Sequence, residues 1–195
     1  MATQTERRAL TRAKLIGAAR EHFARDGYEE THTNDILKYT GLSRGALYHH
    51  FRNKQDLFEA VFIDISNESI EYAVKHGKLK ESSLESLISA CFAWLRVVRR
   101  PEIGSILLDQ GPQVLGWERA RDLEASSSFS LMKQALNLAV KAGEVRVPSV
   151  DLAARLINAI LSEAALAMLH RNPATSVAKQ EAAIRQFIEG LGVPT

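Results

Sequence analysis

The 195-residue sequence contains one cysteine, Cys91, and no long uncharged apolar run. A single thiol cannot form an internal disulfide or a multi-cysteine metal site, as is typical of proteins in a reducing compartment. The N-terminal letters MATQTERRALTRAKLIGAAREHF carry charges throughout and lack the apolar core of a secretion signal. Since a membrane span needs roughly 18 uncharged apolar residues, we expect a cytoplasmic protein with no membrane partner.

Motifs of catalysis are also missing. The sequence has no glycine-rich phosphate-binding loop and no His-Glu-x-x-His zinc motif. Cys91 lies on an apolar helix face without a nearby histidine, which indicates a buried and unreactive thiol. His49 and His50 are neighbours, and adjacent residues on a helix point about 100° apart, so they do not converge on one metal ion. We therefore expect no enzymatic activity, no cofactor and no metal site.

What the chain does contain is an uneven distribution of charge. Residues 1–55 carry ten Lys or Arg and six Asp or Glu, a net charge of +4, whereas residues 56–195 carry fifteen and seventeen, a net charge of −2. Apolar residues make up 46% of the chain, which is enough for a sizeable core. A basic N-terminal segment on a nearly neutral remainder favours a polyanion-binding region at the N-terminus, although a net charge of four is modest support.

Helical periodicity runs through the N-terminal part. Leu15, Ala19 and Phe23 recur at four-residue spacing, which is typical of a helix with one buried face. Glycines and capping residues set the predicted boundaries. The first helix ends at Gly27, the second spans THTNDILKYT and ends at Gly41, the third begins at Arg44 after Ser43, and the fourth follows Asn53 and continues to about Lys75.

The C-terminal part is also predicted to be helical, with interruptions at prolines and glycines. Gly111 and Pro112 form a strong break signal. The predicted helices are SSLESLISACFAWLRVVRR, a short helix from Pro101 that ends near Gln110, a long helix from about Trp117 to Ala142 that closes at Gly143, and two last helices within VDLAARLINAILSEAALAMLH and SVAKQEAAIRQFIEGL.

The second and third predicted helices are short and are joined by a tight turn at Gly41. On the third helix Leu47 and Phe51 lie four residues apart and face inward, while Arg44 and Tyr48 share another, outward face. This arrangement is a helix-turn-helix, whose second helix enters the major groove of DNA.

The segment TNDILKYTGLSRGALYHHFRNKQDLFEAV resembles the DNA-binding domain of the tetracycline-repressor (TetR) family. Thr40 and His32 depart from the family pattern, in which Ala and a capping Ser or Thr are usual. The matching residues are Ile36, Gly41, Leu42, Ser43, Gly45, Leu47, Tyr48, His50, Phe51, Lys54 and Leu57.

The resemblance implies an all-α fold with two domains. Residues 8–68 are expected to form the three-helix DNA-binding domain, with the helix-turn-helix at about 31–50. A long fourth helix would link it to a helical ligand-binding and dimerisation domain over 69–195.

The resemblance also implies roles for single residues. Arg44 can bind guanine O6 and N7 as a bidentate pair, and Gly45 lets the backbone approach closely. Taken singly, Tyr48 has a plain explanation as a packing aromatic, Lys54 as a solvated charge and Ser43 as a helix cap. The expected base-facing residues are Arg44, Gly45, Asn34 and His49, and the expected phosphate contacts are Thr33, Ser43, Tyr48, His50 and Lys54.

The last two helices are apolar enough to form either a monomer core or an association surface. The resemblance favours a four-helix homodimer interface, with two helices from each subunit. Its expected members are Leu152, Leu156, Ile160, Ala164, Met168, Ile184, Phe187 and Ile188.

A ligand pocket is expected among the aromatic residues of the C-terminal part, although each of them could equally be core. Glu163 lies within an apolar run, so it faces solvent, pairs with a cation or meets a ligand. The candidates are Phe92, Trp94, Asp109, Gln110, Trp117, Phe129, Met132 and Glu163. Together these features predict a repressor released from a near-palindromic DNA operator by a small apolar or amphipathic effector; the alternative is a DNA-organising or division factor that responds to no ligand.

Overall fold

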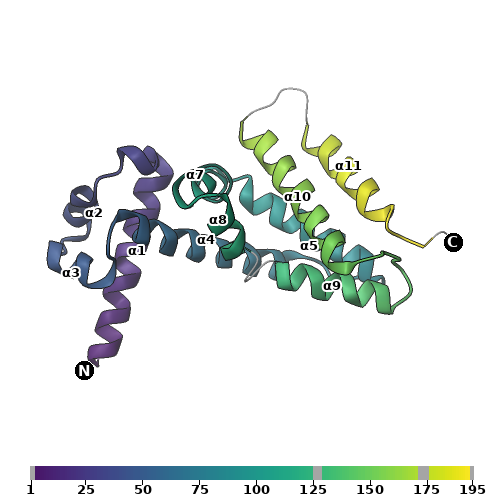
Figure 1. Ribbon diagram of the computed structural model, residues 1–195, viewed down its shortest axis with the longest axis horizontal. Coiled ribbons are helices and arrows are strands. Elements are labelled where there is room, and N and C mark those ends of the chain that lie inside the picture. Colours follow the sequence, from purple (N-terminus) through teal and green to yellow (C-terminus); the bar gives the residue numbers. More distant parts are fainter. Residues whose placement is uncertain (1–2, 125–128, 171–175, 194–195) are drawn as a thin grey trace.

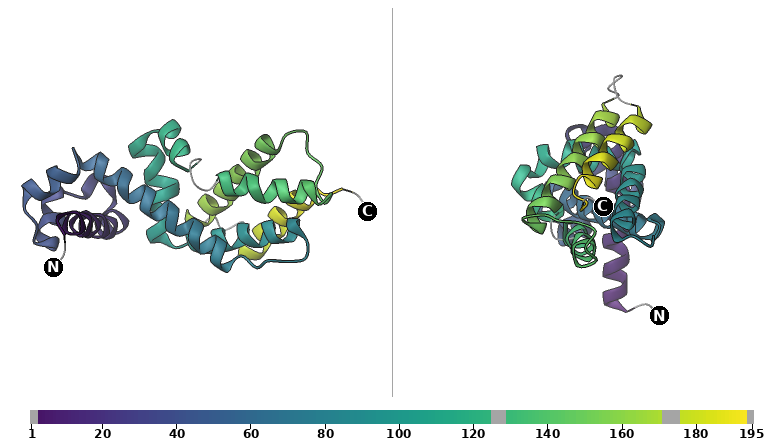
Figure 2. Two further views of the ribbon diagram at one scale, coloured as in Figure 1. Left: turned by 90° about the horizontal axis from the view of Figure 1, so that it is seen from below. Right: turned by 90° about the vertical axis from the view of Figure 1, so that its right-hand side faces the viewer.

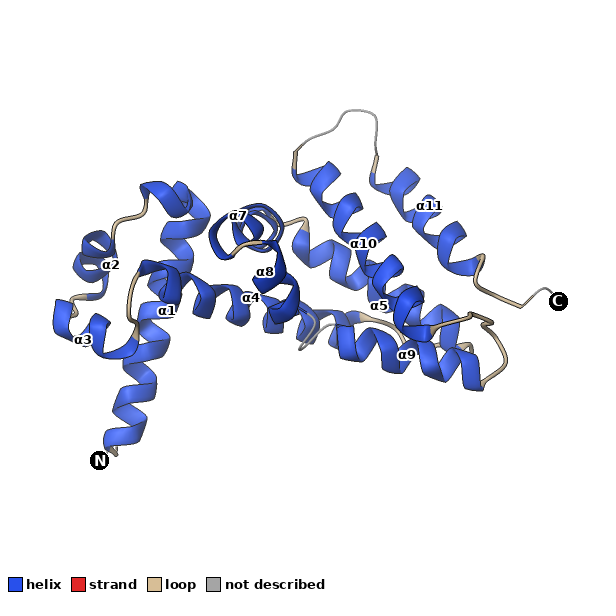
Figure 3. Ribbon diagram, viewed as in Figure 1, coloured by secondary structure: helices blue, strands red, loops and turns tan. Residues whose placement is uncertain are grey.

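The computed structural model describes residues 3–124, 129–170 and 176–193. Within these ranges the chain forms helices and no strand, apart from one isolated bridge between Val145 and Gly192 (Figure 3). A small helical head and a larger helical body lie at the two ends of the molecule, and one long helix joins them (Figure 1). The predicted all-α fold is confirmed.

Four helices build the head and its connection to the body. They are α1 (Gln4–Glu30), α2 (Thr33–Thr40), α3 (Arg44–His50) and the long α4 (Lys54–His76). The body contains α5 (Ser83–Val98), α6 (Pro101–Gly104), the π-helical turn η1 (Ser105–Gln110), α7 (Gly111–Leu115), α8 (Trp117–Glu124), α9 (Ser130–Lys141), α10 (Val150–Leu169) and α11 (Val177–Glu189).

The head has a compact aromatic core. Phe23 of α1 lies 5.1 Å from Phe58 of α4, and Tyr28 lies 5.3 Å from the same ring, both measured between ring centroids in edge-to-face geometry. Gly27 has φ 82°, which ends the straight part of α1 where the sequence predicts and directs Tyr28 back onto this core. The two short helices pack on it through fully buried Ile36 and Leu47.

One predicted helix end is wrong. The helix that begins at Pro101 does not stop near Gln110 but continues through Gly111 and Pro112 to Leu115. The Gly111 N–H donates to the Ile106 carbonyl five residues earlier, and this wide turn places Pro112 at the start of α7, where its missing N–H costs nothing.

Glycine is required at position 111 because α7 packs directly on α4. A Cβ atom there would lie 2.4 Å from Cε2 of Phe62. The break comes instead at Gly116, with φ 82°. The long helix expected over 117–142 is described as two helices, α8 and α9, and residues 125–128 between them lie outside the described ranges.

The head is docked against the α6–α7 segment of the body (Figure 2). Gln110 Nε2 donates to the Phe23 carbonyl at 3.1 Å and to Ser105 Oγ at 2.7 Å. Gln55, near the start of α4, donates to the Val114 carbonyl at 2.8 Å. The orientation of α1 and α4 is therefore tied to the helices of the body.

Candidate nucleic-acid interface and ligand pockets

Helix α3 is held by its inner face and leaves its outer face free. Leu47 is fully buried, and Phe51, which ends the helix, is nearly so. Ser43 caps the N-terminus, since its Oγ accepts from the Ala46 N–H at 3.1 Å. Gly41, with φ 68°, makes the tight turn from α2 that only a residue tolerant of the left-handed region adopts easily.

The outer face of α3 carries cationic and aromatic side chains. Arg44, Tyr48 and His49 are exposed, and the Arg44 guanidinium lies 5.6 Å from the Tyr48 ring centroid. Gly45 is also exposed, and an added Cβ there would meet only Ser43 Oγ, at an ordinary 3.8 Å. Packing inside the protein therefore does not require a glycine at this position.

A polar depression of about 440 Å³ adjoins this face. It brings together Thr33 and Asn34 at the start of α2 with Tyr48 of α3, as the sequence predicts for one binding surface. Its full lining is Thr31, His32, Thr33, Asn34, Tyr48, Arg52, Asn53 and Lys54.

Arg52 was missed by the sequence reasoning. It follows α3 directly, is exposed, and lies 3.4 Å from Asp56 Oδ1 through its Nη2. A cation immediately after a recognition helix is the signal that could have identified it. Asn53 caps α4, with its side chain accepting from the Asp56 N–H at 2.8 Å.

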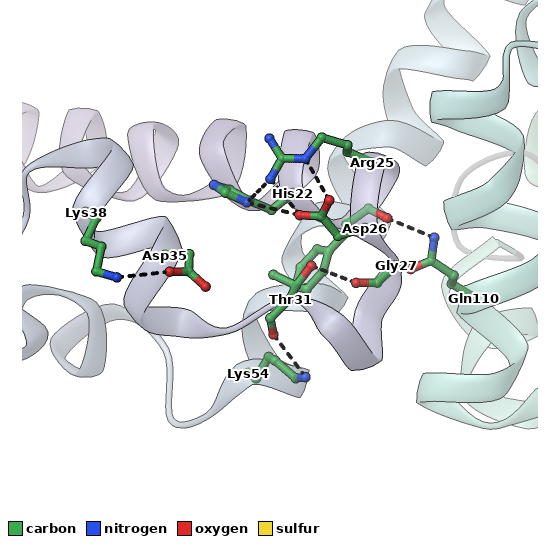
Figure 4. Close-up of polar contacts among 10 residues, drawn as sticks. His22, Arg25, Asp26, Gly27, Thr31, Asp35, Lys38, Lys54 and Gln110 are labelled. Carbon is green, nitrogen blue, oxygen red and sulfur yellow. Dashed lines mark hydrogen bonds and ion pairs between the residues drawn. The ribbon is translucent and has the colours of Figure 1, made fainter.

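Lys54, an expected phosphate contact, has hydrogen-bond partners inside the chain. Its Nζ donates to the Thr31 carbonyl at 3.2 Å (Figure 4) and to the Tyr28 carbonyl at 2.8 Å. The same Nζ lies 4.1 Å from the Tyr28 ring centroid. These carbonyls are left over at the end of α1, which has no basic residue in its last turn. Lys54 thus caps the end of α1 in the protein without DNA.

His50 is half-buried beside Phe51. Burial lowers the pKa of its imidazole, and the positive charges of His49, Arg8 and Arg12 lower it further. The neutral ring is therefore favoured, so His50 is suited to hydrogen bonding and less to binding as a cation.

The body contains an apolar pocket of about 460 Å³, here called the central pocket, between α4, α5, α9 and α10. Among the described residues its wall holds no charged side chain, and its residues with polar groups are Gln134, Asn158, Cys91 and Trp94. Burial raises the pKa of Cys91 to about 12, so the thiol stays protonated and unreactive.

A second depression, the outer pocket, has a volume of about 480 Å³ and a mixed lining from α8, Phe129 and α10. It contains Arg121, Glu124, Arg155 and Glu163. Burial raises the pKa of Glu124 to about 7. The Arg155 guanidinium lies 4.7 Å from the Phe129 ring centroid.

The residues predicted for one ligand site are thus divided. Trp94 and Met132 line the central pocket, whereas Trp117, Phe129 and Glu163 line the outer pocket. Three others line neither. Phe92 packs under the Arg185 guanidinium, Asp109 accepts from Gln113, and Gln110 binds the Phe23 carbonyl.

Asn158 was not predicted, although it lines both pockets. It is a polar residue on the largely apolar α10, and this is the same signal that identified Glu163.

The outer face of the last two helices is apolar. Leu152 of α10 is 57% exposed and Phe187 of α11 is 65% exposed, and Leu156 is similarly exposed. Ile160, Ala164 and Met168 are half-buried in the protomer. The structure corrects the expected role of two residues: Ile184 and Ile188 point into the protomer core, because α11 packs on α10 and α5 through that side.

By length and composition α10 is apolar enough to cross a membrane, and 28% of its apolar window is buried. It packs against α5, α9 and α11 and carries Asp151, Arg155 and Glu163. Leu152 and Leu156 of α10 are exposed, as is Phe187 of the neighbouring α11, and large apolar side chains left exposed on packed helices are typical of a surface covered by another protein chain.

Family models match both parts of the chain. Residues 15–61 match the model of bacterial regulatory proteins of the tetR family. Residues 84–191, more than half of the chain, match the tetracyclin repressor-like C-terminal domain.

Individual proteins show the same similarity. A helix-turn-helix-type transcriptional repressor from Mycobacterium tuberculosis is 30% identical over 129 residues, which cover 65% of this chain and 67% of the relative. The transcriptional regulator SrpR from Pseudomonas putida is 28% identical over 70% of this chain and 64% of its own length. The crystal structure of a TetR-family transcriptional regulator from Pectobacterium atrosepticum matches with a TM-score of 0.83 and 30% identity over 99% of both chains. These two relatives are thus matched over about two thirds of their length, and this solved structure over nearly all of it.

Proposed function

The chain belongs to the tetracycline-repressor (TetR) family of transcription regulators, and from that premise we propose that it is a homodimeric repressor released from its operator by a small molecule. Residues 8–68 bind DNA in this proposal, and residues 69–195 bind the effector and the partner subunit. The exposed outer face of α3, held in place by buried Leu47 and Phe51, is the observation that carries it.

The side chains divide into groups that read bases and groups that hold phosphates. Arg44 is exposed with five donors in a planar fork, which suits guanine O6 and N7, and Gly45 leaves room for the base edges to come close. Hydroxyl, imidazole and guanidinium groups around them bind phosphate oxygens and fix the position of the helix. These are Thr33, Ser43, Tyr48, His50 and Arg52, with Asn34 and His49 as further base-facing residues.

The dimer determines the form of the operator. Pairing through Leu152, Leu156 and Phe187 would relate two heads by a two-fold axis. Two α3 helices then enter major grooves about 34 to 36 Å apart, or a multiple of it, so the operator is a near-palindrome.

The central pocket is the effector site in this proposal. Its uncharged wall suits an apolar or amphipathic molecule whose polar group binds Asn158 or Gln134. Helix α4 connects the central pocket to the DNA-binding surface. Its N-terminal cap, Asn53, lines the depression beside α3, and its last turns supply Ile70 and Ala73 to the central pocket. An effector weakens DNA binding if it prefers the position of α4 in which the two heads are wrongly spaced.

A titration of Arg44→Ala against an operator obtained by binding selection and against scrambled duplex tests DNA reading. We expect a loss of about 1 to 3 kcal/mol on the operator, with relaxed preference at one base position in each half-site. Arg96→Ala, an exposed arginine on α5, is the matched control and should bind as the wild type does. Equal losses on operator and scrambled duplex would show that Arg44 contacts phosphate and reads no base.

Two variants in which a pocket alanine is replaced by leucine test which pocket binds the effector. Ala135→Leu fills the central pocket and Ala159→Leu fills the outer pocket, each without removing a contact. Compounds that raise the melting temperature of the wild type and release the operator should fail with Ala135→Leu and still act on Ala159→Leu. The reverse pattern would assign the effector to the outer pocket, and a complete lack of ligand response would favour a DNA-organising role.

A further inference from the structure

The first turns of α1 project beyond the rest of the head (Figure 2, right). Across residues 4–14, here called the projecting segment, every residue except Thr11 is exposed, and the first buried side chain is that of Leu15. The segment is about 16 Å long at the usual helical rise. A capping box starts it, with the Glu6 N–H donating to Thr3 Oγ1 at 3.2 Å and the Thr3 N–H donating to Glu6 at 2.6 Å.

The projecting segment carries uncompensated positive charge. It contains Arg7, Arg8, Arg12 and Lys14 and a single carboxylate, that of Glu6, which is used by the cap. None of the four cations makes an ion pair with a residue in the described ranges. By contrast, the next arginine along the helix, Arg20, forms an ion pair with Glu68. The charge is therefore available to a partner outside the chain.

Arg8 and Arg12 continue the buried stripe of α1 past the end of the core. On a helix, Arg8 lies almost directly in line with Leu15, seven residues later, and Arg12 with Ala19. These two positions are buried and apolar where α1 packs on the head. In the projecting segment the same side of the helix is cationic. The Arg12 guanidinium lies 5.2 Å from the centroid of Phe51, the residue that ends α3.

We propose that Arg8 and Arg12 form a second phosphate-binding site, which holds the DNA backbone beside the major groove that α3 enters. The proposal rests on the proposed function, because it needs α3 on DNA. Charge complementarity carries it, together with the contact of Arg12 with Phe51, which places this arginine at the end of α3. The contact is with phosphates, since nothing about the segment fixes a side chain against a particular base edge.

A lipid surface fits the projecting segment poorly. A helix that lies on a membrane gathers its large apolar residues on one face. Leu10 is the one large apolar residue of the segment, and it lies about 200° around the helix from Arg8. A polyanion that meets only the cationic side therefore fits better.

The test compares R8Q/R12Q with K78Q/K80Q, which removes the same charge from exposed lysines in the loop between α4 and α5. Binding to a duplex of about 40 base pairs of arbitrary sequence is measured at several salt concentrations, so that no operator is needed. The slope of log affinity against log salt should fall by about two to four for the R8Q/R12Q dimer, with affinity near 0.1 M salt lower by on the order of tenfold or more. K78Q/K80Q should keep the wild-type slope.

The charge-preserving variant R8K/R12K separates phosphate binding from a structural role of the guanidinium against Phe51. It should keep the wild-type slope, because lysine also neutralises a phosphate. A wild-type slope for R8Q/R12Q, or a loss of slope in R8K/R12K equal to that in R8Q/R12Q, would overturn the inference. If R8Q/R12Q has the wild-type slope but Arg44→Ala still impairs operator binding, the proposed function stands and only the second phosphate-binding site is wrong. A wild-type protein that binds neither operator nor arbitrary duplex would instead overturn the proposed function.

Discussion

The head and the body use their apolar side chains in different ways. In the head, Phe23, Tyr28 and Phe58 form one closed aromatic cluster, and the surface around α3 is polar and cationic. In the body, apolar side chains also line the central pocket and cover the outer side of α10 and α11. The head thus exposes a polar and cationic surface around α3, whereas the body has apolar side chains in a pocket and on an exposed face, where we propose that a ligand and a second chain bind.

The head and the body also differ in the chemistry of their surface depressions and pockets. The depression in the head is polar and open to solvent beside α3, and it suits an extended charged partner. The central pocket has no charged lining among the described residues, and it suits a compact molecule. The head and the body are connected by α4 and by hydrogen bonds from Gln110 to Phe23 and from Gln55 to Val114, and these are the contacts that the proposed effector response would change.

The largest expected effect is on the body. Phe187→Glu should place a charge in the dimer interface and raise the dimer dissociation constant at least hundredfold, or about 3 kcal/mol. Leu10→Glu is the matched control, because Leu10 is 67% exposed and Phe187 65% exposed. Light scattering should give a monomer mass for Phe187→Glu and a dimer mass for Leu10→Glu, with unchanged helix content in both. A dimer mass for Phe187→Glu would show that another face forms the interface.

A smaller effect should follow from Lys54→Met in the head. The variant leaves the carbonyls of Tyr28, in the last turn of α1, and Thr31, which follows α1, without this donor, and we expect the free energy of unfolding to fall by about 2 kcal/mol. Lys38→Met is the control, since Lys38 has an exposed contact with Asp35 at 3.4 Å, worth less than about 0.5 kcal/mol. Urea unfolding measures both. Unchanged stability together with a lower salt slope of DNA binding would restore Lys54 as a phosphate contact.

The sequence predicts the head well because its helix ends depend on neighbouring residues. Ser43 caps α3 and Asn53 caps α4 through the backbone three positions on, and Gly41 makes the turn that its own conformation allows. Such signals are contained in a few consecutive letters. Lys54 is different, because its hydrogen-bond partners lie more than twenty residues away in the sequence. A lysine can bind a phosphate or a backbone carbonyl, and the neighbouring residues do not show which of the two it binds.

The body is less predictable for the same reason. On α11 both Ile184 and Phe187 are apolar, and only the packing of α11 on α10 and α5 decides which of them is buried. The break signal at Gly111 and Pro112 was overridden by the contact of α7 with Phe62. The aromatic residues predicted for one ligand site lie in two pockets. Helix periodicity predicts which residues share a face of a helix, but it does not predict which other helix packs against that face.

The smallest expected effect concerns Gly45 and tests whether this glycine allows α3 to approach the DNA bases closely. Glycine within a helix destabilises it by about 0.5 to 1 kcal/mol relative to alanine, and a Cβ at position 45 has open space apart from Ser43 Oγ. Gly45→Ala should therefore make the protein more stable by that amount while it weakens operator binding on the order of tenfold, because the methyl group occupies the gap between α3 and the bases.

Gly17 of α1 provides the control for this prediction. It is exposed in a helix and has nothing within 4 Å of a Cβ position, so Gly17→Ala should give the same gain in stability with wild-type DNA affinity. Thermal unfolding and operator titration of the two variants side by side separate the contributions. If Gly45→Ala gains stability and keeps full affinity, then α3 does not approach the bases at this point, and Arg44 must reach them from a helix that lies further out of the groove.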